Sequence, residues 1–342
     1  MIIQQLIEQL TRPVGVSGDE HKAAETAREL LACYGDTAVD ALGNVICTVR
    51  QPQEGQRHIL LDAHLDQIGL IVQHIDDKGF VRVANVGGID RRVLMASDVT
   101  VYGKQPVFGV ICSNPPHLGA DGEDKKAPRL EEIAIDIGLD KQKATELIAP
   151  GDRVVLHGGV DTLCGGQIVS QALDDRVSCA AILRTLALAP KKDIPCGLSV
   201  LFSTREEVGG QGAATGAFSI RPTEAIVVDV SYAYTPDSPR QKCGDMGAGP
   251  MIGISPVLSR AIFSRLCAIA QREEIPYQTE VMGGTTGTNA DPIVSSRGGV
   301  AAGMVSIPIK YMHTPNETVH PDDVEATARL LAAYILEQGG AR

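Results

Sequence analysis

The 342-residue sequence predicts an α/β protein in which a small β-barrel or sandwich interrupts a domain of alternating strands and helices. Apolar runs of strand length alternate with helical patterns up to residue 69 and again after residue 163. Between these points, short β-like runs follow one another closely, separated by turns. A chain of this length usually forms two domains, or one large domain with an insertion. We therefore expect a discontinuous domain, residues 1–69 and 164–342, and an inserted β domain, residues 70–163.

The N-terminal part predicts two helices and two strands. Residues 2–11 and 19–34 carry apolar side chains at helical spacing, and Gly35 ends the second pattern. Strands are expected at 45–49 and 59–61. The N-terminus lacks the basic region and apolar core of a signal peptide, and no segment approaches 18 apolar residues. We expect a cytoplasmic protein that does not associate with membranes.

Polar residues follow the strand at 59–61. Asp62, His64 and Asp66 alternate with apolar residues, so they share one face if the strand continues. A His-x-Asp pair suits a metal held by imidazole, with a carboxylate close enough to orient the ring. The alternative is an exposed strand end with a polar face.

The inserted segment contains five short strand patterns and one helix pattern. We expect the polar residues 113–129 to form a loop, and His74 and His117 to lie at the surface. The strands are expected at 70–73, 80–83, 99–102, 107–112 and 153–156, and the helix at 141–148.

In the C-terminal part, acidic residues lie before a predicted helix and at the ends of predicted strands. Asp174 and Asp175 precede a helix at 177–188, where carboxylates either cap the helix or belong to a site. Glu206 and Glu207 follow a strand at 198–202, and Asp229 lies at the end of a strand at 225–230. Further elements are expected at 256–274 (helix), 300–307 (strand) and 322–336 (helix).

The pair Glu206–Glu207 has two interpretations. Adjacent side chains on a strand face opposite ways, so both serve one site only where the strand ends. One glutamate would then hold a metal while its neighbour acts on water. The alternative is a charged turn in solvent. His313 follows the strand at 300–307, whereas His320 directly precedes Pro321, so we expect a capping or surface role for His320.

Composition excludes several classes of function. The net charge of −11 disfavours a nucleic-acid partner, and the absence of Trp disfavours a carbohydrate groove. Eight cysteines without a CxxC pair indicate buried free thiols in a reducing compartment. The glycine-rich segment 282–291 lacks Lys and GxGxxG spacing, so a close approach to substrate or subunit is favoured over a phosphate site.

Five ordered segments resemble the M42 family of metallo-aminopeptidases, the glutamyl and deblocking group, some of whose members carry an endoglucanase label. They are residues 15–18, 62–69, 172–176, 203–209 and 311–315. The resemblance implies a zinc-peptidase-like mixed sheet flanked by helices, with an inserted small β-barrel-like domain. It also implies removal of N-terminal residues from peptides, and assembly into a homo-oligomer of dodecameric, hollow tetrahedral form.

The resemblance further implies two divalent metal ions per subunit, zinc foremost and cobalt as the alternative. Asp174 would bridge the ions. It is preferred over Asp175 because related sequences can carry Asn at the second position. The remaining ligands would be His64 and Asp229 for one ion, and Glu207 and His313 for the other. Glu206 would be the general base, and Asp66 would lie behind His64.

Two positions depart from the family pattern. Gln67 stands where Glu is usual, which we expect to alter the charge near the metals. The segment around Asn289 differs from the usual Gly-Thr-Asp-Ala run, which affects the expected pocket.

Two other functions remain open. A related dinuclear-metal amidase or deacylase would act on small N-acyl compounds. A catalytically degenerate scaffold protein is disfavoured because every implied ligand is present, and a glycosidase is disfavoured by the neighbouring histidines and the missing Trp.

Overall fold

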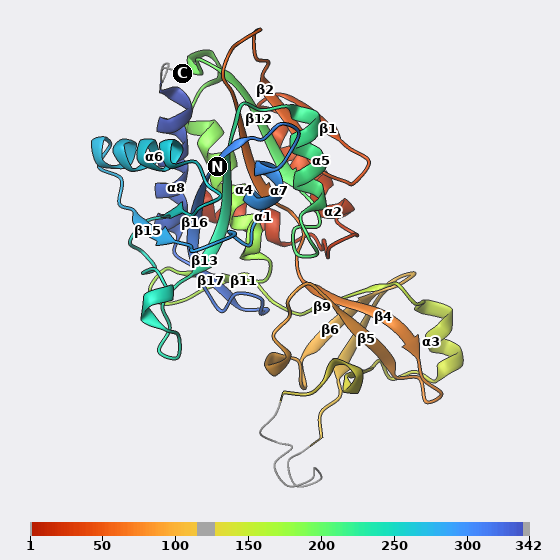
Figure 1. Ribbon diagram of the computed structural model, residues 1–342. Coiled ribbons are helices and arrows are strands. Elements are labelled where there is room, and N and C mark those ends of the chain that lie inside the picture. Colours follow the sequence, from red (N-terminus) through yellow and green to blue (C-terminus); the bar gives the residue numbers. More distant parts are fainter. Residues whose placement is uncertain (1, 115–126, 338–342) are drawn as a thin grey trace.

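The computed structural model describes residues 2–114 and 127–337, so His117 and most of the expected loop lie outside the described residues. Figure 1 shows a larger α/β body that carries both ends of the chain, with a smaller barrel beside it. The predicted fold class, a helix-flanked mixed sheet with a β-barrel insertion, is confirmed.

The larger body is built on an eleven-stranded sheet with a parallel centre. Its path is β1-β2-β12-β3-β13-β16-β17-β11-β10, with β14 on β16 and β15 on β14. The central strands β12, β3, β13 and β16 run parallel, whereas β2 and β17 pair antiparallel at the two flanks. The strands are β1 (Asp36–Val39), β2 (Val45–Arg50), β3 (His58–His64), β10 (Asp161–Thr162), β11 (Ile168–Ser170), β12 (Gly197–Ser203), β13 (Glu224–Tyr232), β14 (Met251–Ile254), β15 (Gln278–Val281), β16 (Ala301–Lys310) and β17 (Glu317–Val319).

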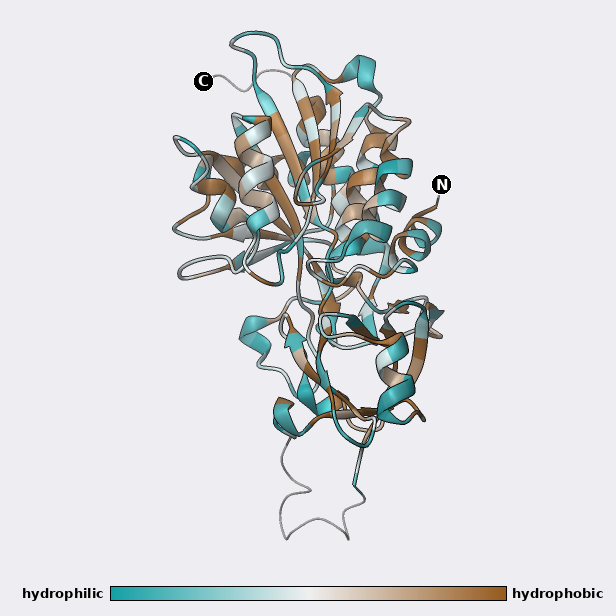
Figure 2. Ribbon diagram, turned by 90° about the vertical axis from the view of Figure 1, so that its right-hand side faces the viewer, coloured by the Kyte–Doolittle hydropathy of each residue, from teal (hydrophilic) through white to brown (hydrophobic). Residues whose placement is uncertain are grey.

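Helices cover both faces of this sheet. One face packs on α1 (Ile3–Thr11), α2 (His21–Leu31), α4 (Leu173–Leu188), α6 (Arg260–Arg272) and α8 (Pro321–Leu336). The other packs on α5 (Gln211–Ile220) and α7 (Ala290–Val294). In Figure 2 the central strands are hydrophobic and lie between helices whose outer turns are hydrophilic. Helix α4 is buried along most of its length, as expected of a helix that is apolar nearly all round.

The predicted helices and central strands are confirmed with small shifts at their ends. Helix α6 begins at Arg260, capped by Ser259, rather than at Pro256. In the larger body, helices α5 and α7 and strands β1, β10, β11, β14, β15 and β17 were not predicted. Helix α5 contains Gly212 and Gly216, which weaken a helix signal, yet both glycines are needed for close packing. A Cβ on Gly216 would lie 2.6 Å from the Leu201 side chain.

The smaller body is a closed antiparallel barrel of order β4-β5-β8-β7-β6-β9 with its own apolar core. Its strands are β4 (Gly69–Ile75), β5 (Val81–Val86), β6 (Asp98–Tyr102), β7 (Pro106–Ile111), β8 (Ala134–Asp136) and β9 (Arg153–Leu156), and its helix is α3 (Lys141–Leu147). Short 3-10 turns lie at Arg91–Val93, Leu130–Glu132, Lys191–Asp193 and Arg240–Lys242. Strand β10 already belongs to the large sheet, and the exact domain limits at residues 69 and 164 stay a prediction.

Several smaller expectations have clear outcomes. His320 caps α8, since its Nδ1 accepts a hydrogen bond from the Asp322 amide at 3.2 Å, and His74 is exposed. All eight cysteines are free thiols. The expectation that they are buried is right for Cys47, Cys179 and Cys196, and wrong for the exposed Cys33 and Cys164. Within residues 2–114 and 127–337, no helix has the length and apolar character needed to cross a membrane.

Candidate metal centre

Acidic and imidazole side chains gather at the carboxyl ends of the parallel strands. His64 is the last residue of β3, and in the sheet it pairs with Ser203, the last residue of β12. Glu206 and Glu207 lie three and four residues after the end of β12, and Asp229 lies in β13. In-register parallel strands therefore deliver these groups to one edge, which is where open α/β sheets keep their ligands.

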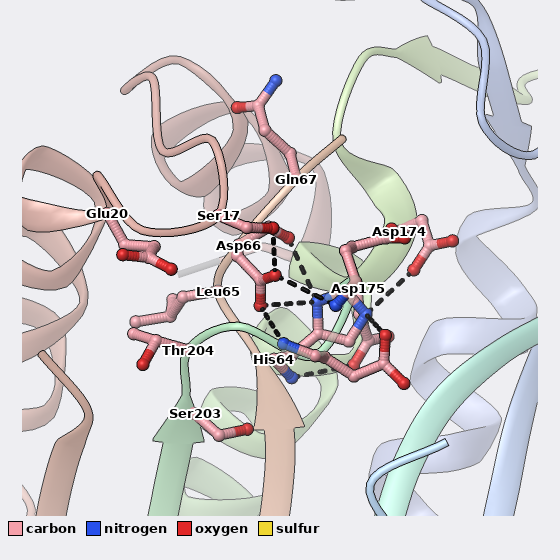
Figure 3. Close-up of polar contacts among 12 residues, drawn as sticks. Ser17, Glu20, His64, Leu65, Asp66, Gln67, Asp174, Asp175, Ser203 and Thr204 are labelled. Carbon is pink, nitrogen blue, oxygen red and sulfur yellow. Dashed lines mark hydrogen bonds and ion pairs between the residues drawn. The ribbon is translucent and has the colours of Figure 1, made fainter. Parts of the chain in front are cut away.

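Asp174 lies at the centre of the cluster. Its Oδ1 is 3.0 Å from Nε2 of His64, and its Oδ2 is 3.3 Å from Nε2 of His313. Oε1 of Glu207 is also 3.3 Å from Nε2 of His313. One carboxylate thus contacts two imidazoles, each through a different oxygen, and the contact to His64 is shown in Figure 3.

Two overlapping groups of possible ligand atoms share His64. In the first, the ligand atoms of His64, Asp174 and Glu207 lie within 4.8 Å of one another. In the second, the same holds for His64, Asp175 and Asp229. Asp175, which sequence reasoning set aside in favour of Asp174, accepts a hydrogen bond from the His64 amide at 3.1 Å. Its second oxygen is buried without a protein partner.

Both histidines present Nε2 to the acids because each Nδ1 is already engaged. Nδ1 of His64 lies 3.0 Å from the backbone oxygen of Asp66, and Nδ1 of His313 lies 2.5 Å from that of Gly88. A carbonyl oxygen only accepts hydrogen bonds, so Nδ1 carries a proton, and Nε2 is the nitrogen that could bind a metal once its own proton is lost. This arrangement is typical of metal-binding histidines.

Asp66 organises the turn that carries the two glutamates. Its Oδ1 accepts a hydrogen bond from the Glu206 amide at 2.9 Å, and its Oδ2 accepts one from the Glu207 amide at 3.1 Å. The Ser17 hydroxyl donates to Oδ2 at 2.6 Å, a contact drawn in Figure 3. Burial raises the pKa of Asp66, but its hydrogen bonds and the nearby His64 outweigh burial and lower it. Asp66 lies beyond the end of β3, so this turn, rather than strand alternation, brings it behind His64.

The electrostatic balance of the cluster favours cations. Burial, helped by the charges of Glu207 and Asp174, raises the pKa of Glu206 to about 7, and burial raises that of Asp229 well above its usual range. Burial disfavours the charged form of His313, but hydrogen bonds with Asp174 and Glu207 prevail and raise its pKa to about 11. Burial likewise lowers the pKa of His64, but hydrogen bonds with Asp174 and Asp66 outweigh it and raise the pKa well above its usual range. Each imidazole therefore holds a proton tightly among carboxylates, in a place where a divalent ion would satisfy the same charges.

The donor set fits such ions. Imidazole nitrogen and carboxylate oxygen together suit zinc and neighbouring transition metals. The partnerless, buried oxygen of Asp175 shows that the side chains around His64 do not satisfy one another fully. The structure thus brings together all five ligands that the resemblance implied, namely His64, Asp174, Glu207, Asp229 and His313.

Glu317 is a site residue that sequence reasoning missed. Its Oε1 accepts a hydrogen bond from the His313 amide at 2.8 Å, and its Oε2 accepts one from the Asp174 amide at 3.0 Å. One buried carboxylate therefore fixes the backbone of two candidate ligands. Glu317 lies two residues beyond the resembling segment 311–315 and follows His313 by four residues, but spacing alone does not indicate a contact with two backbone amides.

Gln67 and Asn289, which mark the two departures from the family pattern, are both held by hydrogen bonds. Oε1 of Gln67 accepts one from the fully buried guanidinium of Arg176 at 3.1 Å. The amide group of Asn289 donates to Asp62 at 2.9 Å and to Ser203 at 2.8 Å. Asp62 is fully buried in β3 and is not part of the ligand groups.

A cavity of about 740 Å³ opens over the cluster. The glycine-rich segment contributes Thr286, Gly287 and Thr288 to its wall, as expected for a segment that approaches a substrate closely. Among the described residues that line the cavity, Lys242 is the only Lys or Arg. Apolar and aromatic lining comes from Tyr232, Met251, Val281, Met282, Met304 and Met312.

The sheet, the barrel and the cluster of acids and imidazoles are together the arrangement expected of a metal-dependent hydrolase. The sequence profile of M42 glutamyl aminopeptidases matches residues 43–330, and the chain belongs to this family. It is therefore an aminopeptidase by family, an enzyme acting on peptides, as the resemblance implied.

The similarity to proteins of known sequence or structure covers nearly the whole chain. A putative aminopeptidase of Acetivibrio thermocellus is 35% identical, covering 96% of this chain and 97% of the relative. An aminopeptidase from the archaeon Desulfurococcus kamchatkensis has a TM-score of 0.91 at 33% identity, covering 98% of this chain and 94% of that chain. The TET1 peptidase of Pyrococcus horikoshii, which can assemble into a tetrahedron or a large octahedral shell, has a TM-score of 0.85 at 31% identity, with 97% and 99% covered.

Proposed function

We propose that this protein is a dinuclear-metal aminopeptidase that removes N-terminal residues from peptides. The observation that carries the proposal is the Asp174 carboxylate, which faces His64 with one oxygen and His313 with the other. His64, Asp174 and Asp229 would hold one ion, and Asp174, Glu207 and His313 the second. The imidazole and carboxylate donors favour zinc, with cobalt as the alternative.

Bound divalent ions would polarise the scissile carbonyl and lower the pKa of the attacking water. Glu206 is the proposed general base. Its carboxylate lines the cavity and lies 4.0 Å from Nε2 of His64, and without metal ions burial raises its pKa to about 7. Glu206 takes a proton from water and delivers it to the leaving amine, while Asp66 holds its backbone in place.

The surroundings of the site support a peptide substrate and a self-assembling enzyme. The cavity offers both polar groups and an apolar wall, which suits the end of a peptide chain with its first side chain. Similarity to a peptidase that forms tetrahedral shells supports a homo-oligomer, and we propose a dodecamer. Eight free cysteines support a reducing compartment, the cytoplasm.

A substrate panel tests the proposed function. Protein loaded with zinc or cobalt is assayed on aminoacyl-anilides, on the same compounds with an acetylated α-amine, and on N-acyl amino acids. We expect hydrolysis of the free-amine compounds and little of the acetylated ones. Preferential cleavage of N-acyl amino acids would instead identify a deacylase, and a metal-loaded protein inactive on every compound would identify a degenerate scaffold.

A further inference from the structure

We propose that the inserted barrel completes one of the two metal sites, with the backbone carbonyl of Gly88 positioning His313. The inference rests on the proposed function, because it concerns the ion held by Asp174, Glu207 and His313. Gly88 is a positioning residue, since it acts on the ion only through the imidazole.

The Gly87–Gly88 loop belongs to the barrel and is fixed by the barrel's own side chains. It follows β5, whose last residue is Val86. Nδ2 of Asn85 donates a hydrogen bond to the Gly87 oxygen at 2.7 Å. On the other side, the Asp90 carboxylate accepts a hydrogen bond from the Arg92 amide at 2.9 Å and caps the next turn. The barrel therefore sets the course of this loop on both sides of the glycines.

This loop reaches the candidate metal centre directly. The Gly88 oxygen lies 2.5 Å from Nδ1 of His313, although the two residues are 225 positions apart in the sequence. Because the Gly88 oxygen accepts this hydrogen bond, Nδ1 of His313 carries a proton and Nε2 faces the acids. Nε2 lies 3.3 Å from a carboxylate oxygen of Asp174 and 3.3 Å from one of Glu207.

The other histidine is oriented without the barrel. Nδ1 of His64 donates to the backbone oxygen of Asp66, two residues further along the same segment. The candidate ligands His64, Asp174 and Asp229 all belong to the larger body. The two metal sites therefore differ, since only the one that contains His313 depends on where the barrel loop lies.

The approach is close enough to require glycine at both positions. A Cβ on Gly88 would lie 2.9 Å from Nδ1 and 3.2 Å from Cε1 of His313. Gly87 has a φ of +73°, and its Cβ would lie 2.8 Å from the Ile68 side chain and 3.2 Å from Oε2 of Glu207. Two candidate ligands of the same ion thus share one glycine pair as their neighbour.

The test compares metal binding by two variants of the full-length chain. Gly88→Ala pushes the imidazole or the loop aside, whereas Asn85→Ala removes the brace of the loop without adding an atom near the site. For both, we expect one ion to bind as in the wild type and the other to bind about 10- to 100-fold more weakly, as when an outer partner of a ligand is lost. Gly298→Ala is the matched control, because its Cβ would meet no atom within 4 Å.

The readout is the zinc content per chain after equilibrium dialysis against buffered zinc, with anomalous diffraction to locate the remaining ion. We expect that ion beside His64 and Asp229 and not beside His313. Wild-type affinity for both ions in the folded variants would overturn the inference, and so would equal weakening of both ions. Should Gly88→Ala not fold, Asn85→Ala decides alone. A wild-type protein that binds no zinc would instead refute the proposed function.

Discussion

Glu206→Gln is the substitution that separates proton transfer from metal binding most cleanly. Glutamine has nearly the same shape as glutamate, and the backbone at this position is held by the bond from its amide to Asp66. The carboxylate lies 4.0 Å from His64 and is outside the proposed ligand set. We therefore expect both metal ions and the fold to persist while the proton acceptor is lost.

The expected loss can be estimated from the surroundings of Glu206. A positioned general base contributes about 100- to 10,000-fold, equivalent to about 3 to 5 kcal/mol of transition-state stabilisation. The other acids among the described cavity-lining residues are the proposed ligands and Glu280. Glu280 is already bound to the hydroxyls of Ser231 and Ser306. Because no free base replaces Glu206 there, we expect a loss of about 1,000-fold or more in kcat.

The assay is steady-state hydrolysis of an aminoacyl-anilide, combined with elemental analysis of the same protein sample. The matched control is Glu146→Gln, which makes the same chemical change on the exposed surface of α3 and should leave kcat unchanged. A Glu206→Gln variant that keeps its metals and works at near wild-type rate would show that Glu206 is not the general base. Loss of metal would show that Glu206 is a ligand instead.

Three further predictions concern metal binding. Glu207→Ala should reduce metal occupancy, and full occupancy by elemental analysis would count against a ligand role. In Glu317→Gln, one of the two backbone amides that donate to Glu317 would face an NH₂ group, which cannot accept its hydrogen bond. We therefore expect about 10- to 100-fold weaker metal binding in equilibrium dialysis. Unchanged affinity would contradict the proposed role of this carboxylate. In chelated protein the raised pKa values of Glu206 and His313 mean that the folded state binds more protons than the unfolded state. Their stabilising contribution, complete below the unfolded pKa values of 4.5 and 6.5, is lost as the pH rises toward the folded values of about 7 and about 11. The gap in Tm between zinc-loaded and chelated protein should therefore widen from pH 5 to pH 8, and a constant gap would contradict the assignment.

The strand-end residues of the site could be predicted because their signal is local. His64, Glu206 and Asp229 each stand in or just after an apolar run of strand length, and parallel strands bring such ends together. The choice between a helix cap and a ligand for Asp174 could not be made from spacing. It depends on how α4 meets the sheet, and only the family resemblance indicated it.

What the sequence could not predict depends on contacts between distant backbone groups. The hydrogen bond between Gly88 and His313 joins the barrel to the larger body. Its acceptor is a backbone oxygen, so no side chain at position 88 indicates the contact in the sequence. The role of Glu317 depends on the turn that aims two amides at one carboxylate. The effect expected of Gln67 on the charge near the metals stays a prediction. Its hydrogen bond with Arg176, 109 positions away, is another contact that spacing does not indicate.

Anomalous diffraction from crystals of the zinc-loaded protein, recorded on both sides of the zinc absorption edge, tests the central claim most directly. We expect two zinc peaks per chain with the Asp174 carboxylate between them, one ion contacting His64 and Asp229 and the other contacting Glu207 and His313. A single peak per chain, or two peaks that do not share Asp174, would contradict it.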